Sequence, residues 1–136
     1  MKISARNQFA GKVVKIQEGA VNSIVTIDVN GTALTATISN AAVSELGLKD
    51  GAAATAVIKA TEVLIAKGEL QISARNKLAG KVASVEKGAV NSIVKLTTGI
   101  GDVTSTISNS AVAELGLAEG VEAVAVIKAT SVMVGC

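Results

Sequence analysis

The sequence of 136 residues has no histidine, proline, tryptophan or tyrosine, and it has one phenylalanine and one cysteine. Without histidine, and with Cys136 as the only thiol, there is no ligand set for zinc or haem and no Ser-His or Cys-His pair for catalysis. A lone cysteine forms no intrachain disulfide, which fits a reducing compartment. A phosphate-binding loop of the type GxxxxGK(S/T) is also missing. We therefore expect a protein that is not an enzyme.

Long apolar runs and a strong charge of one sign are missing as well. The apolar runs, such as 52–58, are far shorter than the roughly 20 residues of a membrane-spanning helix. The N-terminal residues lack the apolar stretch of a secretory signal. The net charge is only +2, and Phe9 is the one aromatic ring on which a base could stack. The sequence thus predicts a cytoplasmic protein with neither a membrane nor a nucleic acid as partner.

Apolar residues are nevertheless plentiful, at 49% against 18% charged residues, so the chain can bury a core and fold. Because aromatic residues are almost absent, this core must consist of the smaller Val, Ile, Leu and Ala side chains. A domain of fewer than about 70 residues with such a core is short of stability, and oligomerisation is a common remedy.

An internal repeat organises the chain, because most blocks have a counterpart 69 positions later. When 3–67 is aligned with 72–136, 36 of the 65 pairs are identical. The recurring blocks of the first copy are I-S-A-R-N (3–7), G-A-V-N-S-I-V (19–25), T-I-S-N (37–40), E-L-G-L (45–48) and A-V-I-K-A-T (56–61). The boundary falls near 67–69, which predicts two tandem domains, 1–67 and 70–136, with a very short linker.

The pattern of one copy predicts mostly strands. Residues 12–18, 21–29 and 32–38 are expected as strands, joined by turns at 19–20 and at Asn30-Gly31. Ser39 or Asn40 is expected to cap a short helix over 41–46, with Gly47 just past its end. Residues 52–59 and 62–66 are the final strands. This order predicts an all-β fold of two tandem OB-like five-stranded barrels, each with one short helix. The alternative is a small open β-roll whose edges pair between subunits.

Three polar blocks of each copy have the composition of an oxyanion-binding segment. Ser4-Ala5-Arg6-Asn7 offers a hydroxyl, backbone N–H groups and a fixed positive charge. The alternative is an edge strand with a solvated arginine. Lys59-Ala60-Thr61 places a lysine and a hydroxyl at the end of an apolar strand, although many strands simply end at the surface. Ser39-Asn40 precedes a helix whose N–H groups attract anions. The alternative is an ordinary N-cap, which we favour for Asn40.

A fourth block, the turn 19–23 with its copy at 88–92, is rich in backbone N–H donors. The alternative is a hairpin turn in which geometry requires the glycine. Apart from Glu45 and Glu114 on the predicted helices, no acidic residue lies in a recurring block.

Together these blocks resemble the molbindins, the Mop-type molybdate-binding proteins, and in particular their tandem di-Mop members. The match consists of I-S-A-R-N, the following G-K-V, G-A-V-N, T-I-S-N, E-L-G-L and A-V-I-K-A-T, once per copy. The resemblance implies OB-like barrels, a homo-oligomer in the form of a trimer around a three-fold axis, and molybdate sites between domains. One class of site would take Ser4, Ala5 and Arg6 from one domain and Ser39, Lys59, Ala60 and Thr61 from a neighbouring domain. The second copy offers Ser73, Ala74, Arg75, Ser108, Lys128, Ala129 and Thr130. A second class, nearer the axis, would use Asn22 and Asn91.

The resemblance and the chemistry of the residues agree on the ligand. Molybdate is a tetrahedral dianion with only acceptor oxygens, and none of the residues named above is acidic. We expect molybdate, or the near-identical tungstate, as ligand, and neither a cofactor nor a metal cation. The expected function is intracellular storage, buffering and homeostasis, because the chain has no room for the repressor or transporter domains to which related domains are fused. The alternative is a molybdate-sensing regulatory or interaction module that acts on a partner protein.

Overall fold

A curled, five-stranded antiparallel sheet occurs twice in the computed structural model, which describes residues 1–136. Unit 1 consists of residues 1–58 and 128–136, and unit 2 consists of residues 59–127. The elements of unit 1 are β1 (Asn7–Glu18), β2 (Asn22–Val29), β3 (Thr32–Ser39), α1 (Asn40–Glu45), β4 (Ala53–Ile58), the 3-10 turn η2 (Ala129–Ser131) and β10 (Met133–Gly135). Those of unit 2 are the 3-10 turn η1 (Ala60–Glu62), β5 (Leu64–Ala66), β6 (Asn76–Lys87), β7 (Asn91–Thr98), β8 (Gly101–Ser108), α2 (Asn109–Leu115) and β9 (Glu122–Ile127).

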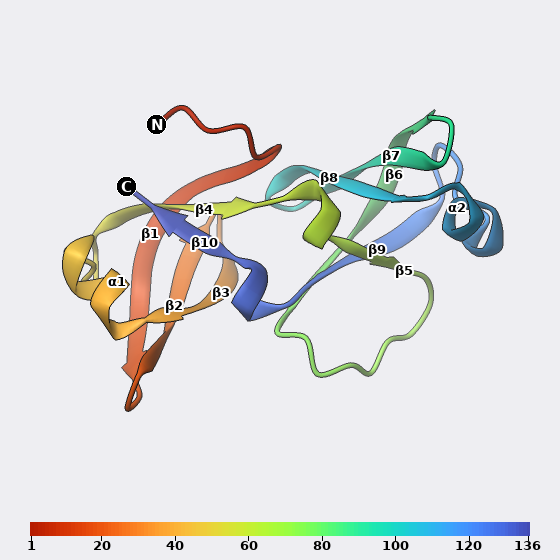
Figure 1. Cartoon of the computed structure of the whole chain (residues 1–136). Helices are drawn as coiled ribbons and strands as arrows, with labels where there is room; N and C mark the ends of the chain where they lie inside the picture. Colours follow the sequence, from red (N-terminus) through yellow and green to blue (C-terminus); the bar gives the residue numbers. More distant parts are fainter. The chain divides into compact units, whose positions relative to one another are not determined.

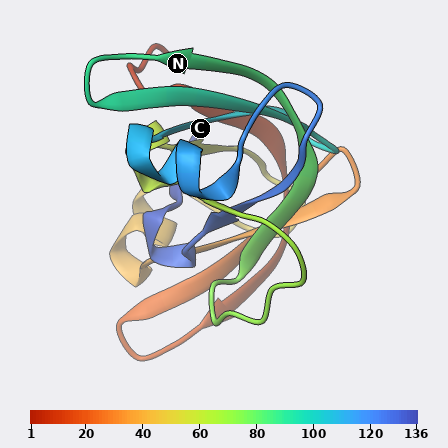
Figure 2. The same ribbon diagram turned by 90° about the vertical axis from the view of Figure 1, so that its right-hand side faces the viewer.

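The strand order is β10-β4-β1-β2-β3 in unit 1 and β5-β9-β6-β7-β8 in unit 2 (Figure 1). In each unit the short helix lies between the third and fourth strands of its repeat, and α2 contacts β7 and β8 (Figure 2). The prediction of an all-β, tandem OB-like fold with one short helix per copy is therefore confirmed. No helix is long and apolar enough to span a membrane.

Strand β1 is longer than its sequence pattern predicts. It begins at Asn7 instead of at residue 12, because its first half, from Asn7 to Lys12, pairs with β4. Its second half pairs with β2, and the register shifts between Val13 and Lys15. One extra residue in a strand bends it and increases its twist. The bent β1 therefore pairs with β4 along one edge and with β2 along the other. Strand β6 repeats this arrangement, with its shift between Val82 and Ser84.

The C-terminal segments of the two repeats are exchanged. Strand β10 pairs with β4 of the first repeat, and β5 pairs with β9 of the second repeat (Figure 1). The structural units therefore differ from the sequence domains 1–67 and 70–136, because residues 59–67 belong to unit 2 and 128–136 to unit 1. The physical reason lies after β4, where the chain passes through η1 in extended and 3-10 conformation and does not fold back onto the same strand. The edge of β4 is left to the tail of the other repeat, which begins with the same K-A-T and has the same buried valine.

The core consists of small aliphatic side chains, as the composition predicts. Alternate residues of β2 are buried, for example Val25 and Ile27, and the exchanged tails contribute Val63 in unit 2 and Val132 in unit 1. A buried valine stabilises a fold by about 1.5–3 kcal/mol relative to an exposed one. The tails are thus part of the hydrophobic cores as well as edge strands.

Two glycine positions show why the turns and the strand crossing form as they do. Asn30 and Gly31 have φ angles of 50° and 86°, which are the left-handed values that a two-residue hairpin turn needs, so the predicted turn is confirmed.

Gly11 lies where β1 passes the carbonyl oxygen of Asp28, and a Cβ atom there would collide with that oxygen. Gly80 has the same relation to Thr97 in unit 2. These glycines allow β1 and β6 to bend sharply.

Candidate functional site

The S-A-R segment is an exposed loop that leads into the long strand of each repeat. Ser4 and Arg6 are exposed, and Ala5 is half-buried. The Gln8 side-chain amide donates hydrogen bonds to the carbonyl oxygens of Ile3 (3.2 Å) and Ala5 (2.9 Å). These bonds hold residues 3–5 in a turn beside β1, so the alternative interpretation of an edge strand is wrong. Ser73, Ala74 and Arg75 have the same exposure in unit 2.

A buried asparagine follows each loop and marks the end of a strand ladder. Asn7 is only 1% exposed and pairs with Ile58, the last residue of β4. Asn76 pairs with Ile127 in the same way, and its side-chain amide donates to the Ile127 carbonyl oxygen at 3.2 Å. The arginine of each S-A-R loop directly precedes this pair in the chain, and the lysine of the K-A-T segment directly follows it. The asparagine thus fixes the backbone from which the donor side chains extend.

The K-A-T segments form the short 3-10 turns. Turn η1 contacts β8, and η2 contacts β3. The lysine and the threonine of each segment are exposed, namely Lys59, Thr61, Lys128 and Thr130. Ala60 is half-buried and Ala129 is buried. The exchange of tails changes the grouping expected from the repeats. Unit 1 combines Ser39 with Lys128, Ala129 and Thr130, and unit 2 combines Ser108 with Lys59, Ala60 and Thr61.

Ser39, and not Asn40, caps helix α1. The Ser39 hydroxyl oxygen accepts a hydrogen bond from the Ala42 N–H at 3.0 Å, and Ser108 does the same for the Ala111 N–H at 3.1 Å. The interpretation of Asn40 as an N-cap is therefore wrong. Both serines remain exposed at the end of an edge strand, so their hydroxyl groups can still donate to a ligand.

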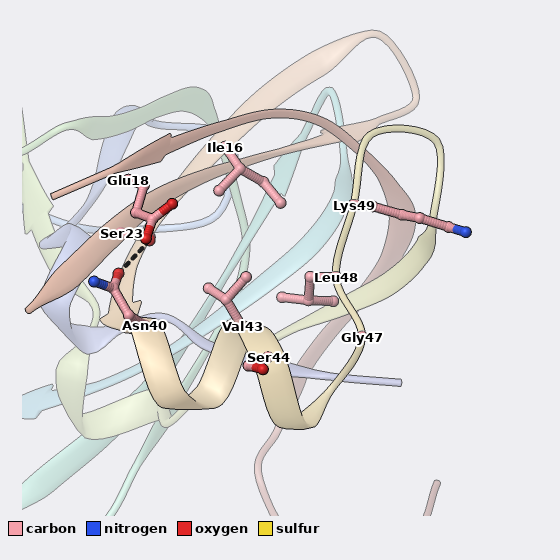
Figure 3. A pocket seen from close by; sticks show the side chains of 9 residues that line it. All are labelled: Ile16, Glu18, Ser23, Asn40, Val43, Ser44, Gly47, Leu48 and Lys49. Carbon is pink, nitrogen blue, oxygen red and sulfur yellow. Dashed lines mark hydrogen bonds between the residues drawn. The ribbon is translucent and has the colours of Figure 1, made fainter.

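Asn40 instead links the helix to the β1–β2 turn through hydrogen bonds. The buried Ser23 hydroxyl donates to the Asn40 side-chain oxygen at 2.5 Å, and the Asn40 amide donates to the Gly19 carbonyl at 2.9 Å (Figure 3). Its backbone N–H donates to the Val21 carbonyl at 2.8 Å. Ser92 and Asn109 form the same bonds in unit 2, at 2.6 Å between the side chains and 3.0 Å to Gly88. Local spacing did not predict this corner, although the identity of both blocks in both copies was a signal that they work together.

The turn that this corner holds presents an exposed tip. Asn22 and Asn91 are exposed, and their backbone carbonyls accept from the N–H groups of Gly19 and Gly88 at 2.9 and 2.8 Å. Val21 and Val90 are 72% and 71% exposed, the largest values among the big apolar side chains.

A hollow of about 560 Å³ lies beside the corner in unit 1 (Figure 3). It is lined by Ile16, Glu18, Ser23, Asn40, Val43, Ser44, Gly47, Leu48 and Lys49. The Glu18 carboxylate extends toward the Ser23–Asn40 pair in Figure 3, whereas the Lys49 ammonium points away. A carboxylate in this position repels a dianion. A second hollow, in unit 2, has Glu69 and Glu122 in its lining. Neither hollow is lined by a residue of the S-A-R loops or of the K-A-T segments, or by Ser39 or Ser108. The hydroxyl, lysine and arginine groups of these segments are exposed.

Two curled OB-like sheets in tandem, with hydroxyl, lysine and arginine donors exposed at their strand ends, define the class of this protein. The chain belongs to the TOBE domain family, whose profile matches residues 3–65 and again 72–134, and it has the tandem, Mop-type form of that family.

Several known proteins are similar to this chain in sequence, and one is similar in structure. A probable molybdenum-pterin-binding protein of Haemophilus influenzae is 60% identical over 66 residues, which are 48% of this chain and 96% of that protein. The molybdenum transport protein ModE of Herbaspirillum seropedicae is 42% identical over 98% of this chain, which spans only 51% of ModE. Among solved structures, the cytoplasmic molybdate-binding protein ModG with molybdate bound has a TM-score of 0.95 and 44% identity, over 99% of both chains.

Proposed function

We propose that this chain binds molybdate, or tungstate, on its exposed donor segments. The observation that carries the proposal is the full-length likeness to ModG, whose structure contains molybdate. The identity of 44% extends over both repeats, and the probable molybdenum-pterin-binding protein matches a single repeat at 60%. The residues proposed to bind the oxyanion are the ones that the resemblance implies. They are Ser4, Ala5, Arg6, Ser39, Lys59, Ala60 and Thr61 with their counterparts in the second copy, and Asn22 and Asn91 nearer the axis.

The chemistry of these segments supports a fully deprotonated oxyanion. The oxygens of molybdate accept hydrogen bonds and cannot donate them at neutral pH, and the serine, threonine, lysine and arginine side chains all donate. A protonated phosphate would carry an O–H group for which these segments offer no carboxylate acceptor. Sulfate has the same charge as molybdate but is smaller, so its exclusion depends on the size of the assembled site. Tungstate has nearly the same size and is expected to bind as well.

The sites are proposed to form between neighbouring domains in a trimer. Each would combine an S-A-R loop from one domain with the serine and K-A-T segment of another. The donor side chains are exposed within a single chain, and a second surface would enclose them. The exposed tips at Val21 and Val90, next to Asn22 and Asn91, would lie nearer the three-fold axis.

The proposed role is cytoplasmic storage and buffering of the oxyanion, without catalysis and without a nucleic-acid partner. ModG, which this chain matches over its whole length, is a cytoplasmic molybdate-binding protein. A regulatory role is the second candidate, because a transcriptional regulator ModE of Yersinia pestis is 36% identical over 98% of this chain. This chain spans only 52% of that regulator, so the likeness alone does not carry the regulatory activity over to this chain.

Isothermal titration calorimetry tests the proposal. Saturable heat with molybdate and tungstate, and none with sulfate or phosphate, is the expected result. A double variant, Arg6→Ala with Arg75→Ala, should lose much of the molybdate heat while it stays folded, since both arginines are exposed and their removal leaves the cores intact. The absence of heat with either metal oxyanion on a folded, oligomeric sample would overturn the proposal.

A further inference from the structure

The two repeats differ in charge beside their S-A-R loops. Gln8, the second residue of β1, is neutral, and its amide lies within 2.9 Å of the Ala5 carbonyl oxygen. Lys77 occupies the same position of β6, is exposed, and pairs with Val126 as Gln8 pairs with Val57. The side chain at this position lies next to the loop in unit 1, so a lysine at its counterpart brings a positive charge to the loop of Ser73 and Arg75.

The same kind of difference occurs beside the β1–β2 and β6–β7 turns. Glu18 ends β1, pairs with Ser23, and extends its carboxylate toward the Ser23–Asn40 corner (Figure 3). Lys87 ends β6 and pairs with Ser92 in the same register. The hydrogen bonds of the two corners have the same partners and nearly the same lengths. The hydrogen-bonded frame is therefore the same in both units, while the charge of the last strand residue is inverted. Because Glu86 stands where the first copy has Gln17, the net charge of the last two strand residues changes from −1 to zero.

The net charges of the two whole units differ in the opposite direction, because unit 1 is the more positive. Unit 1 contains six basic and four acidic side chains, and unit 2 contains seven of each. Bulk electrostatics would thus favour anion binding in unit 1. The lysines at 77 and 87 are a local feature of the second repeat, beside the two segments that are proposed to hold the oxyanion.

We propose that the two repeats bind the oxyanion unequally, and that the donor segments of the second repeat, next to Lys77 and Lys87, have the higher affinity. The inference rests on the proposed function. One unit charge at a distance of several ångströms from an exposed dianion changes affinity by about three- to tenfold in low salt. Between exposed groups this difference shrinks as the ionic strength rises.

Calorimetric titration of the full chain with molybdate, in low and in physiological salt, tests the inference. The wild-type isotherm is expected to contain a tighter class of site that responds to substitutions in the second repeat and a weaker class that responds to substitutions in the first. Lys77→Gln and Lys87→Gln, which each remove one positive charge, should weaken the tighter class about three- to tenfold in low salt, and Lys77→Arg should preserve it. Gln8→Lys and Glu18→Gln, which each change the charge by one unit in the positive direction, should strengthen the weaker class by a similar factor. Lys15→Gln is the matched control, because Lys15 is exposed on the face of β1 opposite to Glu18, and it should change neither class.

Two results would overturn the inference and leave the proposed function intact. One is a single class of site that responds equally to substitutions in either repeat. The other is a tighter class that is lost when Gln8 is substituted and is unchanged when Lys77 is substituted. No molybdate heat in any variant would overturn both. A thermal melt of each variant without ligand shows whether the substitution has changed the fold.

Discussion

The Ser23 hydroxyl donates to the Asn40 side-chain oxygen at 2.5 Å, across 17 residues of sequence. This bond joins the turn after β1 to the first residue of helix α1, and the Asn40 amide completes the link at the Gly19 carbonyl. Its repetition by Ser92 and Asn109 means that both units position their donor-rich turns by the same frame.

Asn40→Ala is expected to lower the free energy of unfolding by about 1–3 kcal/mol, because it leaves the buried Ser23 hydroxyl without its partner. Chemical denaturation of the variant measures this change. The double variant with Ser23→Ala should cost clearly less than the two single variants together, since the partners act as one unit. Strict additivity would contradict the direct coupling of these two side chains.

Ser105→Ala is expected to destabilise unit 2 by about 1–3 kcal/mol. The buried Ser105 hydroxyl donates to the Val63 carbonyl oxygen at 2.6 Å, and this acceptor on the exchanged tail would be left unsatisfied. Denaturation monitored by hydrogen exchange of unit 2 measures the effect. Ser110→Ala, at an exposed position of α2, is the control and should change the stability by less than about 0.5 kcal/mol. Equal effects of the two substitutions would argue against the tail contact.

Deletion of residues 128–136 is expected to unfold unit 1 and to spare unit 2. Unit 1 would lose β10 and the buried Val132, whereas unit 2 is complete within residues 59–127. Hydrogen–deuterium exchange should therefore show lost protection in 7–58 and retained protection in 76–127. If each tail packed onto its own repeat, protection would be lost in 76–127 instead, and the exchange of tails would be disproved.

Saturating molybdate is expected to raise the melting temperature, because a ligand that binds only the folded assembly stabilises it by mass action. At a free concentration of about 100 times Kd the gain is about 2.7 kcal/mol. Differential scanning calorimetry with and without molybdate measures the shift, with sulfate at the same ionic strength as control. The Arg6→Ala, Arg75→Ala double variant should melt like the wild type without ligand and gain much less from molybdate. An identical gain would show that the arginines do not contact the ligand.

Local sequence signals predicted much of the fold. The turn at Asn30-Gly31, the helix end at Gly47 and the aliphatic core are confirmed by the φ angles and the burial of these residues. The early start of β1 was missed because residues 7–11 pair with β4, a partner more than 40 positions away, and only half of this stretch is apolar. The exchange of the tails could not be predicted from one repeat alone. Both tails have K-A-T, a valine and an apolar strand segment at the same positions, so the sequence does not tell which strand edge each one joins.

The donor segments show a similar division. Their residue types and strand-end positions could be predicted from the repeated blocks, and the structure places their hydroxyl, lysine and arginine side chains at exposed loops, turns or helix caps, with the alanines partly or fully buried. The role of Asn40 was not predicted, because a side chain that reaches 17 and 21 residues back to Ser23 and Gly19 leaves no trace in local spacing. The grouping of Ser39 with Lys128 instead of Lys59 likewise depends on the exchanged tail.

The most direct test of the central claim is anomalous diffraction at the molybdenum edge from crystals grown with molybdate. The proposal predicts anomalous peaks within hydrogen-bond distance of the S-A-R loops and of the serine and K-A-T segments of neighbouring domains, at Arg6, Arg75, Lys59 and Lys128. Peaks confined to the hollow beside Glu18, or no ordered molybdenum at all in crystals soaked to saturation, would contradict it.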